Sequence, residues 1–272
     1  MGRGLAFEGV DVSFGLSLPG DGGSWDSAVA SLKRVLGGFV PNEGFCMAEL
    51  PLEAFISGPG NEGFLLRGGL ETAVRARTPV KDVCLRLGRP FIDSDCPTGS
   101  YRAAAAECRA LYDQYAPAPP PGAPAARIAV AAKPEISAFL LEFPLAFAYG
   151  TRERRHLDRL VRDLAGLPLA IAFFNPGWYS LRVIEALREK NIGLCLMDFP
   201  SPRDGRGDVA GSAPPQFDMA TSSLVYLKFH GFSPDRATPG ELEARIASWI
   251  PRIEALALQA QTLRIVFQGG GG

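Results

Sequence analysis

The sequence has few of the residues from which metal sites and disulfide frameworks are built. Its 272 residues include only two histidines, His156 and His230, so a metal site made mainly of imidazoles cannot be assembled from this chain. The five cysteines are an odd number and widely spaced, without a C-x-x-C pair. Buried thiols in a reducing compartment fit this pattern better than disulfides or zinc ligands. We therefore expect no metal.

An excess of charge of one sign and a long apolar run are also missing. Lys and Arg total 28 against 29 Asp and Glu, so the net charge of −1 does not favour nucleic acid as a partner. The longest apolar stretch, 136–150, is interrupted by Glu142 and Pro144 and falls short of the roughly 20 residues of a membrane-spanning helix. No window resembles a signal peptide. We expect a cytoplasmic protein without a membrane partner.

The signature motifs of several enzyme and cofactor classes are absent as well. Neither G-x-x-x-x-G-K-[ST], H-E-x-x-H nor G-x-S-x-G occurs, and these motifs mark P-loop proteins, zinc peptidases and serine hydrolases. The segment 58–63 (GPGNEG) matches G-x-G-x-x-G. Because Pro59 stiffens the turn and the residues that follow are a poor helix start, a glycine-rich turn is the better interpretation. We expect no cofactor.

What the sequence does contain is a series of short apolar runs that alternate with amphipathic stretches. The apolar runs predict strands at 10–17, 45–51, one within 64–87, 136–144, 169–175, 192–200, 223–231 and 262–268. The amphipathic stretches predict helices at 24–36, 100–115, 151–165, 180–190 and 239–259.

This alternation indicates βαβ units and a parallel sheet. About eight strands predict an α/β fold of the (β/α)8 TIM-barrel type, with or without the final helix. A doubly wound open sheet is the alternative, because a strand count does not show closure. We interpret the proline-rich segment 116–126 as a surface loop within a single domain, 1–272, since the first half alone is too poor in strands to close a core. A linker between two domains is the other interpretation.

The predicted strand 223–231 carries polar side chains on one face. The pleat places Tyr226, Lys228 and His230 on one side and apolar residues on the other. In a barrel the apolar side packs against helices, so these three residues would line the lumen, with His230 nearest the C-terminal mouth, where such barrels have their active sites. An inward Lys228 needs a partner, and Glu142 is the candidate. A structural network of ion pairs is the alternative to a functional site.

Four segments carry a resemblance to a known family. They are 139–147 (FLLEFPLAF), 167–178 (LPLAIAFFNPGW), 193–200 (GLCLMDFP) and 221–231 (TSSLVYLKFHG). In this order and spacing, the run from about 136 to 268 resembles the YecE-like family of unknown function, which implies a TIM-type barrel. Members of that family usually have E-F-R where this chain has Ala172, Phe173 and Phe174. The chain therefore departs from the family by a carboxylate and a guanidinium group.

Two functions follow from these residues. The first is a hydrolase or lyase that acts on a polar, sugar- or phosphate-containing molecule at the barrel mouth. Its catalytic candidates are Asp198, Glu142 and His230, with His230 as the acid or base because its ordinary pKa is near ~6.5. The second function, favoured by the departures at 172 and 174, is a non-catalytic barrel that binds a ligand or a protein. The candidates for substrate binding are Asn175, Trp178, Tyr226, Lys228 and Gln268.

Overall fold

The structure, a computed structural model, describes residues 10–17, 47–52, 82–116, 135–200, 215, 219–231 and 238–268. The predicted helix at 24–36, the glycine-rich turn at 58–63 and residues 117–126 of the proline-rich segment lie outside the described residues. The single-domain assignment therefore stays a prediction.

In the described residues, nine parallel strand segments form one sheet, in the order β6-β5-β4-β3-β2-β1-β9-β8-β7. They are β1 (Asp11–Ser17), β2 (Met47–Pro51), β3 (Asp82–Leu87), β4 (Glu135–Phe143), β5 (Leu169–Phe173), β6 (Gly193–Leu194), β7 (Leu196–Asp198), β8 (Leu224–Phe229) and β9 (Thr262–Gln268).

The two edges of this sheet meet, because β6 and β7 are halves of one predicted strand and only Cys195 separates them. Strand β6 pairs with β5, and β7 pairs with β8. The Cys195 amide also donates to the carbonyl of Ile171 on β5 at 2.8 Å. The sheet therefore closes into a barrel of eight strands. The prediction of a TIM-type barrel is confirmed, and an open sheet is excluded.

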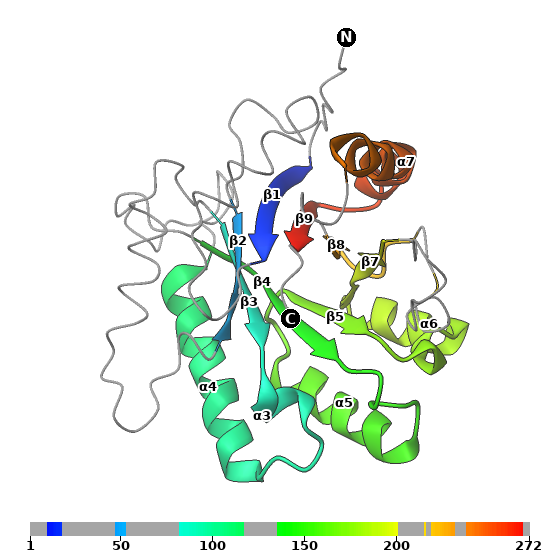
Figure 1. Ribbon diagram of the computed structural model, residues 1–272. Coiled ribbons are helices and arrows are strands. Elements are labelled where there is room, and N and C mark those ends of the chain that lie inside the picture. Colours follow the sequence, from blue (N-terminus) through cyan, green and yellow to red (C-terminus); the bar gives the residue numbers. More distant parts are fainter. Residues whose placement is uncertain are drawn as a thin grey trace.

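In the part of the chain that the structure describes, helices lie on the outside of the strands, as Figure 1 shows. They are α3 (Arg89–Ile92), α4 (Thr98–Tyr115), α5 (Thr151–Asp163), α6 (Leu181–Glu189) and α7 (Pro239–Ala257), with a short 3-10 helix at Pro176–Trp178. The predicted N-cap Ser180 accepts from the amide of Val183, and a capping box of Thr238 and Glu241 opens α7. Among the described residues, no helix has the length and apolar character needed to cross a membrane.

The apolar residues form two layers. The outer layer packs strand residues against helix residues and includes a stack of Phe143, Phe147, Phe173 and Trp178. The inner layer contains residues of the strands and their ends only, so it fills the lumen. Its buried members are Met47, Cys84, Ala138, Leu140, Ala170, Ala172, Cys195, Met197, Leu224, Tyr226 and Val266.

The lumen is tightly filled at β1 and β2. A Cβ atom on Gly15 would lie 2.7 Å from the backbone oxygen of Met47, so only glycine fits there. The predicted buried thiols are found at Cys84, Cys108 and Cys195, all free. Burial raises the pKa of Cys84 and of Cys108 to about 12, and therefore these thiols are not nucleophiles at neutral pH. Cys46 lies outside the described residues.

Candidate functional site

Charged side chains lie on both sides of the apolar filling of the lumen. Toward the N-terminal ends of the strands, Arg264 Nη2 lies 2.6 Å from Asp11 Oδ2. Toward the C-terminal ends, Lys228 Nζ lies 2.7 Å from Glu49 Oε1 and 2.7 Å from Glu142 Oε1. The predicted pairing of Lys228 with Glu142 is confirmed. Catalysis in barrels of this type takes place at the C-terminal end, here called the mouth.

Lys228 keeps its charge although none of its side chain is exposed. Burial by itself lowers the pKa of Lys228, but the negative charges of Glu49 and Glu142 raise it above its ordinary value. An ammonium group with two carboxylates at hydrogen-bond distance is therefore a permanent cation in the lumen.

Glu49 on β2 is the most enclosed acid of the site, with 1% of its surface exposed. It accepts hydrogen bonds from Ser17 Oγ at 2.6 Å, from Tyr226 Oη at 2.7 Å and from Lys228. Burial raises the pKa of Glu49, but the charge and hydrogen bonds of Lys228 and the two hydroxyl donors outweigh it, so the pKa is about 2. Sequence reasoning missed this residue. Its only signal is a single acid within the apolar run 45–51.

Arg86 on β3 completes a group that we call the mouth network: Glu49, Glu142, Lys228 and Arg86. Its Nη1 lies 3.5 Å from Glu49 Oε1, and its Nε lies 3.8 Å from Glu142 Oε2. Both distances are long for hydrogen bonds, so Arg86 retains donors for another acceptor. The side chains of Arg86 and Glu142 are 25% and 18% exposed, unlike those of Glu49 and Lys228. The sequence analysis also missed Arg86.

His230 directly follows the last residue of β8, and Gln268 is the last residue of β9. Both therefore lie closer to the C-terminal end of the barrel than Lys228 does. The ring of His230 stacks on Phe199 at 4.4 Å between centroids and meets the ring of Phe174 edge-on at 5.8 Å. Its Nε2 atom and Oε1 of Gln268 are buried, and neither has a hydrogen-bond partner in the described structure. Burial and repulsion from Lys228 lower the pKa of His230 to about 3, whereas the predicted acid–base role assumed the ordinary value. His230 is neutral at pH 7.

Asp198 is not brought together with Glu142. Its register partner on β8 is Phe229, which packs outward against Trp249 of α7. The carboxylate of Asp198 accepts from Trp249 Nε1 at 3.0 Å and from Nε of Arg245 at 2.9 Å, so it clamps β7 to α7. The sequence predicted correctly that Asp198 ends a strand. The residues before it, Leu196 and Met197, are apolar and point to opposite faces, so they do not indicate which face is inward.

Asn175 and Trp178 also lie outside the lumen, in the connection between β5 and α6. Trp178 Nε1 donates to the carbonyl of Phe147 at 2.7 Å, and its ring stacks in the outer layer. Asn175 accepts from the amide of Gly177 at 2.9 Å and donates to the carbonyl of Leu145 at 2.7 Å. Both side chains use their polar atoms to brace this connection.

The structure thus groups five of the predicted site residues in the lumen and three outside it. The former are Glu142, Tyr226, Lys228, His230 and Gln268, and the latter are Asn175, Trp178 and Asp198. The described part of the chain contains no cluster of three or more His, Cys, Asp or Glu side chains suited to a metal ion.

The fold and site define a TIM-type α/β barrel with an ion-pair network at its mouth. Residues 114–270 match the family described as a protein of unknown function, DUF72, and the chain belongs to this family. YecE belongs to the same family, so the resemblance inferred from the sequence is confirmed. No curated protein matches the chain.

Solved structures agree with this assignment. A DUF72 family protein from Enterococcus faecalis V583 superposes with a TM-score of 0.60 at 16% identity, over 97% of this chain and 92% of that chain. A DUF72 family protein from Thermotoga maritima MSB8 superposes with a TM-score of 0.56 at 14% identity, over 95% of this chain and 92% of that chain. At these identities the likeness establishes the fold alone.

The low pKa of His230 predicts an acid-sensitive contribution to stability. Between about pH 6.5 and pH 3 the imidazole is protonated in the unfolded chain but neutral in the folded one, so the free energy of unfolding falls as the pH falls. At about 1.4 kcal/mol per pH unit, acidification from pH 7 to pH 4.5 costs about 2–3 kcal/mol through this residue. We expect urea unfolding at both pH values to show that the free energy of unfolding of His230→Phe falls less on acidification than that of the native protein, by about this amount. Equal losses in the two proteins would contradict a ring that stays neutral in the folded protein.

Proposed function

We propose that the barrel mouth binds a small polar molecule with an anionic group, such as a sugar phosphate, without catalysing its conversion. The observation that carries this proposal is the partial exposure of Arg86 and Glu142 above a network that is otherwise buried. Arg86 has donors left for a phosphate or carboxylate, which guanidinium groups bind in a bidentate manner. Glu142 can accept a hydrogen bond from a ligand hydroxyl group.

The charges of the mouth network support an anionic ligand. The two negative charges of Glu49 and Glu142 equal in number the two positive charges of Lys228 and Arg86. Lys228, however, already contacts both carboxylates at 2.7 Å. Arg86 stands farther from each carboxylate, at 3.5 and 3.8 Å, and it is the more exposed of the two cations. A ligand anion at Arg86 would therefore meet a cation whose charge is only partly compensated.

Binding without turnover is supported by the way the predicted catalytic residues are distributed. Asp198 holds Trp249 and Arg245 outside the lumen. His230 is a poor base because its pKa is about 3. The positions where other members of the family carry a carboxylate and a guanidinium group are occupied by Ala172, which is fully buried, and Phe174, which packs against Phe199.

A hydrolase or lyase is the second candidate function, and one observation favours it. The carboxylate of Glu142 is partly exposed and anchored by Lys228 at 2.7 Å, at the end of the barrel where enzymes of this fold act. A fixed carboxylate in that position is suited to act as a general base.

Calorimetry and thermal unfolding with a panel of sugars and the matching sugar phosphates test the proposal. A bound ligand stabilises the native state by about 2.7 kcal/mol at 100 times its dissociation constant. We expect stabilisation by at least one phosphorylated member, and Arg86→Gln is expected to weaken that binding about tenfold or more. Arg102→Gln, which changes an exposed arginine on α4, is the matched control.

Product analysis on the same panel separates the two candidate functions. Unchanged ligand after prolonged incubation supports binding alone. Turnover that disappears in Glu142→Gln while binding persists would establish the enzyme instead. If no member of the panel stabilises the protein, the proposal of a small anionic ligand is wrong.

A further inference from the structure

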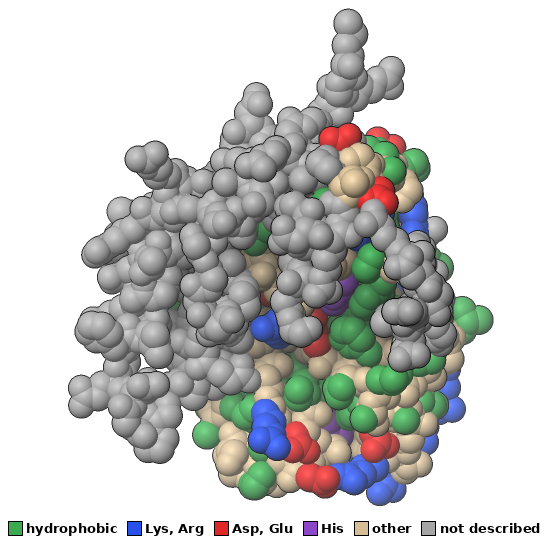
Figure 2. Space-filling view, viewed as in Figure 1, with side chains coloured by type: hydrophobic (Ala, Val, Ile, Leu, Met, Phe, Trp, Pro, Cys, Tyr) green, Lys and Arg blue, Asp and Glu red, His purple; other side chains and the backbone are tan. Residues whose placement is uncertain are grey.

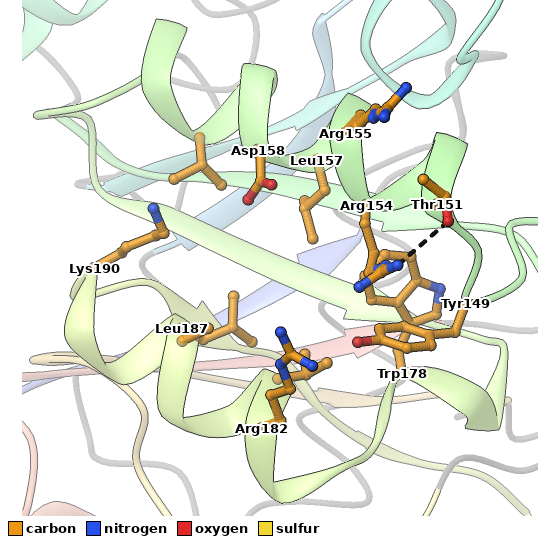
Figure 3. A pocket seen from close by; sticks show the side chains of 13 residues that line it. Tyr149, Thr151, Arg154, Arg155, Leu157, Asp158, Trp178, Arg182, Leu187 and Lys190 are labelled. Atoms are coloured by element: carbon orange, nitrogen blue, oxygen red, sulfur yellow. Dashed lines mark hydrogen bonds between the residues drawn. The ribbon is translucent and has the colours of Figure 1, made fainter.

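A groove separates α5 and α6 on the outer surface of the barrel, away from the mouth network (Figure 3). It encloses about 380 Å³, and apolar side chains from both helices form its floor. A second hollow of about 500 Å³ continues it past Val161 and Lys190 to Gly166 and Asn191. The α5–α6 groove is therefore about as long as the 13-residue helix α5, roughly 20 Å.

Positively charged side chains lie at both ends of this apolar floor. In Figure 3, Arg154 and Arg182 lie at one end and Lys190 at the other, with Leu157 and Leu187 between them. The side chains of Arg182 and Lys190 form neither an ion pair nor a hydrogen bond with any part of the chain that the structure describes.

The remaining polar groups of the groove do not cancel this charge. The guanidinium of Arg154 lies over the ring of Tyr149, 5.2 Å from its centroid. Asp158 is the one acid among the residues that line the main cavity, and it forms no ion pair with the described residues. The groove therefore combines an apolar floor with an excess of positive charge along its edges.

From this combination we propose that the α5–α6 groove docks an amphipathic helix of a partner protein, with Asp and Glu side chains flanking the apolar face of that helix. A narrow apolar floor of this length is matched by side chains at positions i, i+4 and i+7 of a helix. The acidic flanks would meet Arg154, Arg182 and Lys190 at the two ends.

The placement of the cations favours an extended partner over a small anion. A single phosphate group could reach Arg154 and Arg182 but not Lys190 at the opposite end (Figure 3). It would also leave uncovered the partly exposed apolar side chains of Val161 and Ala186, which line the groove. A helix of about the length of α5 covers the floor and reaches both ends in one binding mode.

Fluorescence anisotropy with the full-length protein and a designed probe tests this proposal. The probe is a lactam-bridged helical peptide of about 13 residues with leucines at i, i+4, i+7 and i+11 and glutamates on both flanks. We expect micromolar affinity, weakened about fivefold or more by Arg182→Glu and by Lys190→Glu, which change exposed residues. Arg102→Glu on α4 carries the same change of charge and is expected to leave the affinity unchanged.

Control ligands decide between this proposal and other occupants. A peptide with lysines in place of the glutamates, and one with the same composition but a scrambled apolar face, are expected to bind at least about tenfold more weakly. The proposal is overturned if the probe does not bind below about 1 mM, if the scrambled peptide binds equally well, or if both charge reversals have no effect. Binding of inorganic pyrophosphate that depends on Arg182, without binding of the probe, would assign the groove to small anions.

Discussion

Lys228→Met is expected to lower the free energy of unfolding by about 3–5 kcal/mol at pH 7, because it leaves a carboxylate buried without its main cation. Glu49 would keep its hydrogen bonds from Ser17 and Tyr226, but its nearest cation would be Arg86 at 3.5 Å. Methionine has an unbranched side chain similar in shape to the lysine stem, so the loss does not come from a cavity. Urea unfolding measures the difference.

The pH dependence of this loss identifies its cause. In the native protein the pKa of Glu49 is held at about 2, below its ordinary value, so the stability it contributes is present above about pH 4.5 and is lost as the pH falls toward 2. In the variant this pKa is expected to rise, and the deficit relative to the native protein should shrink between pH 7 and pH 5 as the carboxyl group takes up a proton. If the difference in the free energy of unfolding between Lys228→Met and the native protein does not change with pH, the cause is a packing defect and not the unpaired carboxylate.

The double variant Glu49→Gln, Lys228→Met is the matched control for charge. It removes both buried charges together, while Glu142 remains partly exposed and within 3.8 Å of Arg86. Because an uncharged amide is cheaper to bury than an unpaired carboxylate, the double variant should regain at least about half of the stability lost in Lys228→Met. A further loss in the double variant would contradict the account.

Asp198→Ala is expected to lower the free energy of unfolding by about 2–4 kcal/mol and to leave ligand binding at the mouth unchanged. The substitution removes the acceptor of the buried Trp249 Nε1 and the charged partner of Arg245, both on α7. Urea unfolding measures the first effect, and calorimetry with the ligand found for the mouth measures the second.

A double-mutant cycle with Trp249→Phe tests whether Asp198 acts through α7. The two substitutions should be less than additive, because each breaks the same hydrogen bond. If Asp198→Ala instead abolishes ligand binding while stability stays within about 0.5 kcal/mol of the native protein, Asp198 belongs to the mouth and the clamp is not its role.

Much of the architecture could be predicted from the sequence, because strand and helix periodicities are local. The run 192–200 indicated a strand, and the structure contains it as β6 and β7 with a one-residue break at Cys195. The alternation along 224–230 placed Tyr226 and Lys228 on the inner face, where both are fully buried. The same alternation implied a partner for Lys228, since a buried charge must be compensated.

The sequence by itself determined which segments are strands, which faces are polar on β8, and that Lys228 needs an acid. Only the tertiary structure decided that Glu49, 179 positions away in the chain, is one of its partners, and that Asp198 faces α7. Periodicity is a property of one segment, whereas closure of the barrel sets which side chains meet across the lumen. The same closure encloses the half-buried ring of His230 beside Lys228, and the resulting fall in its pKa is a property of that environment.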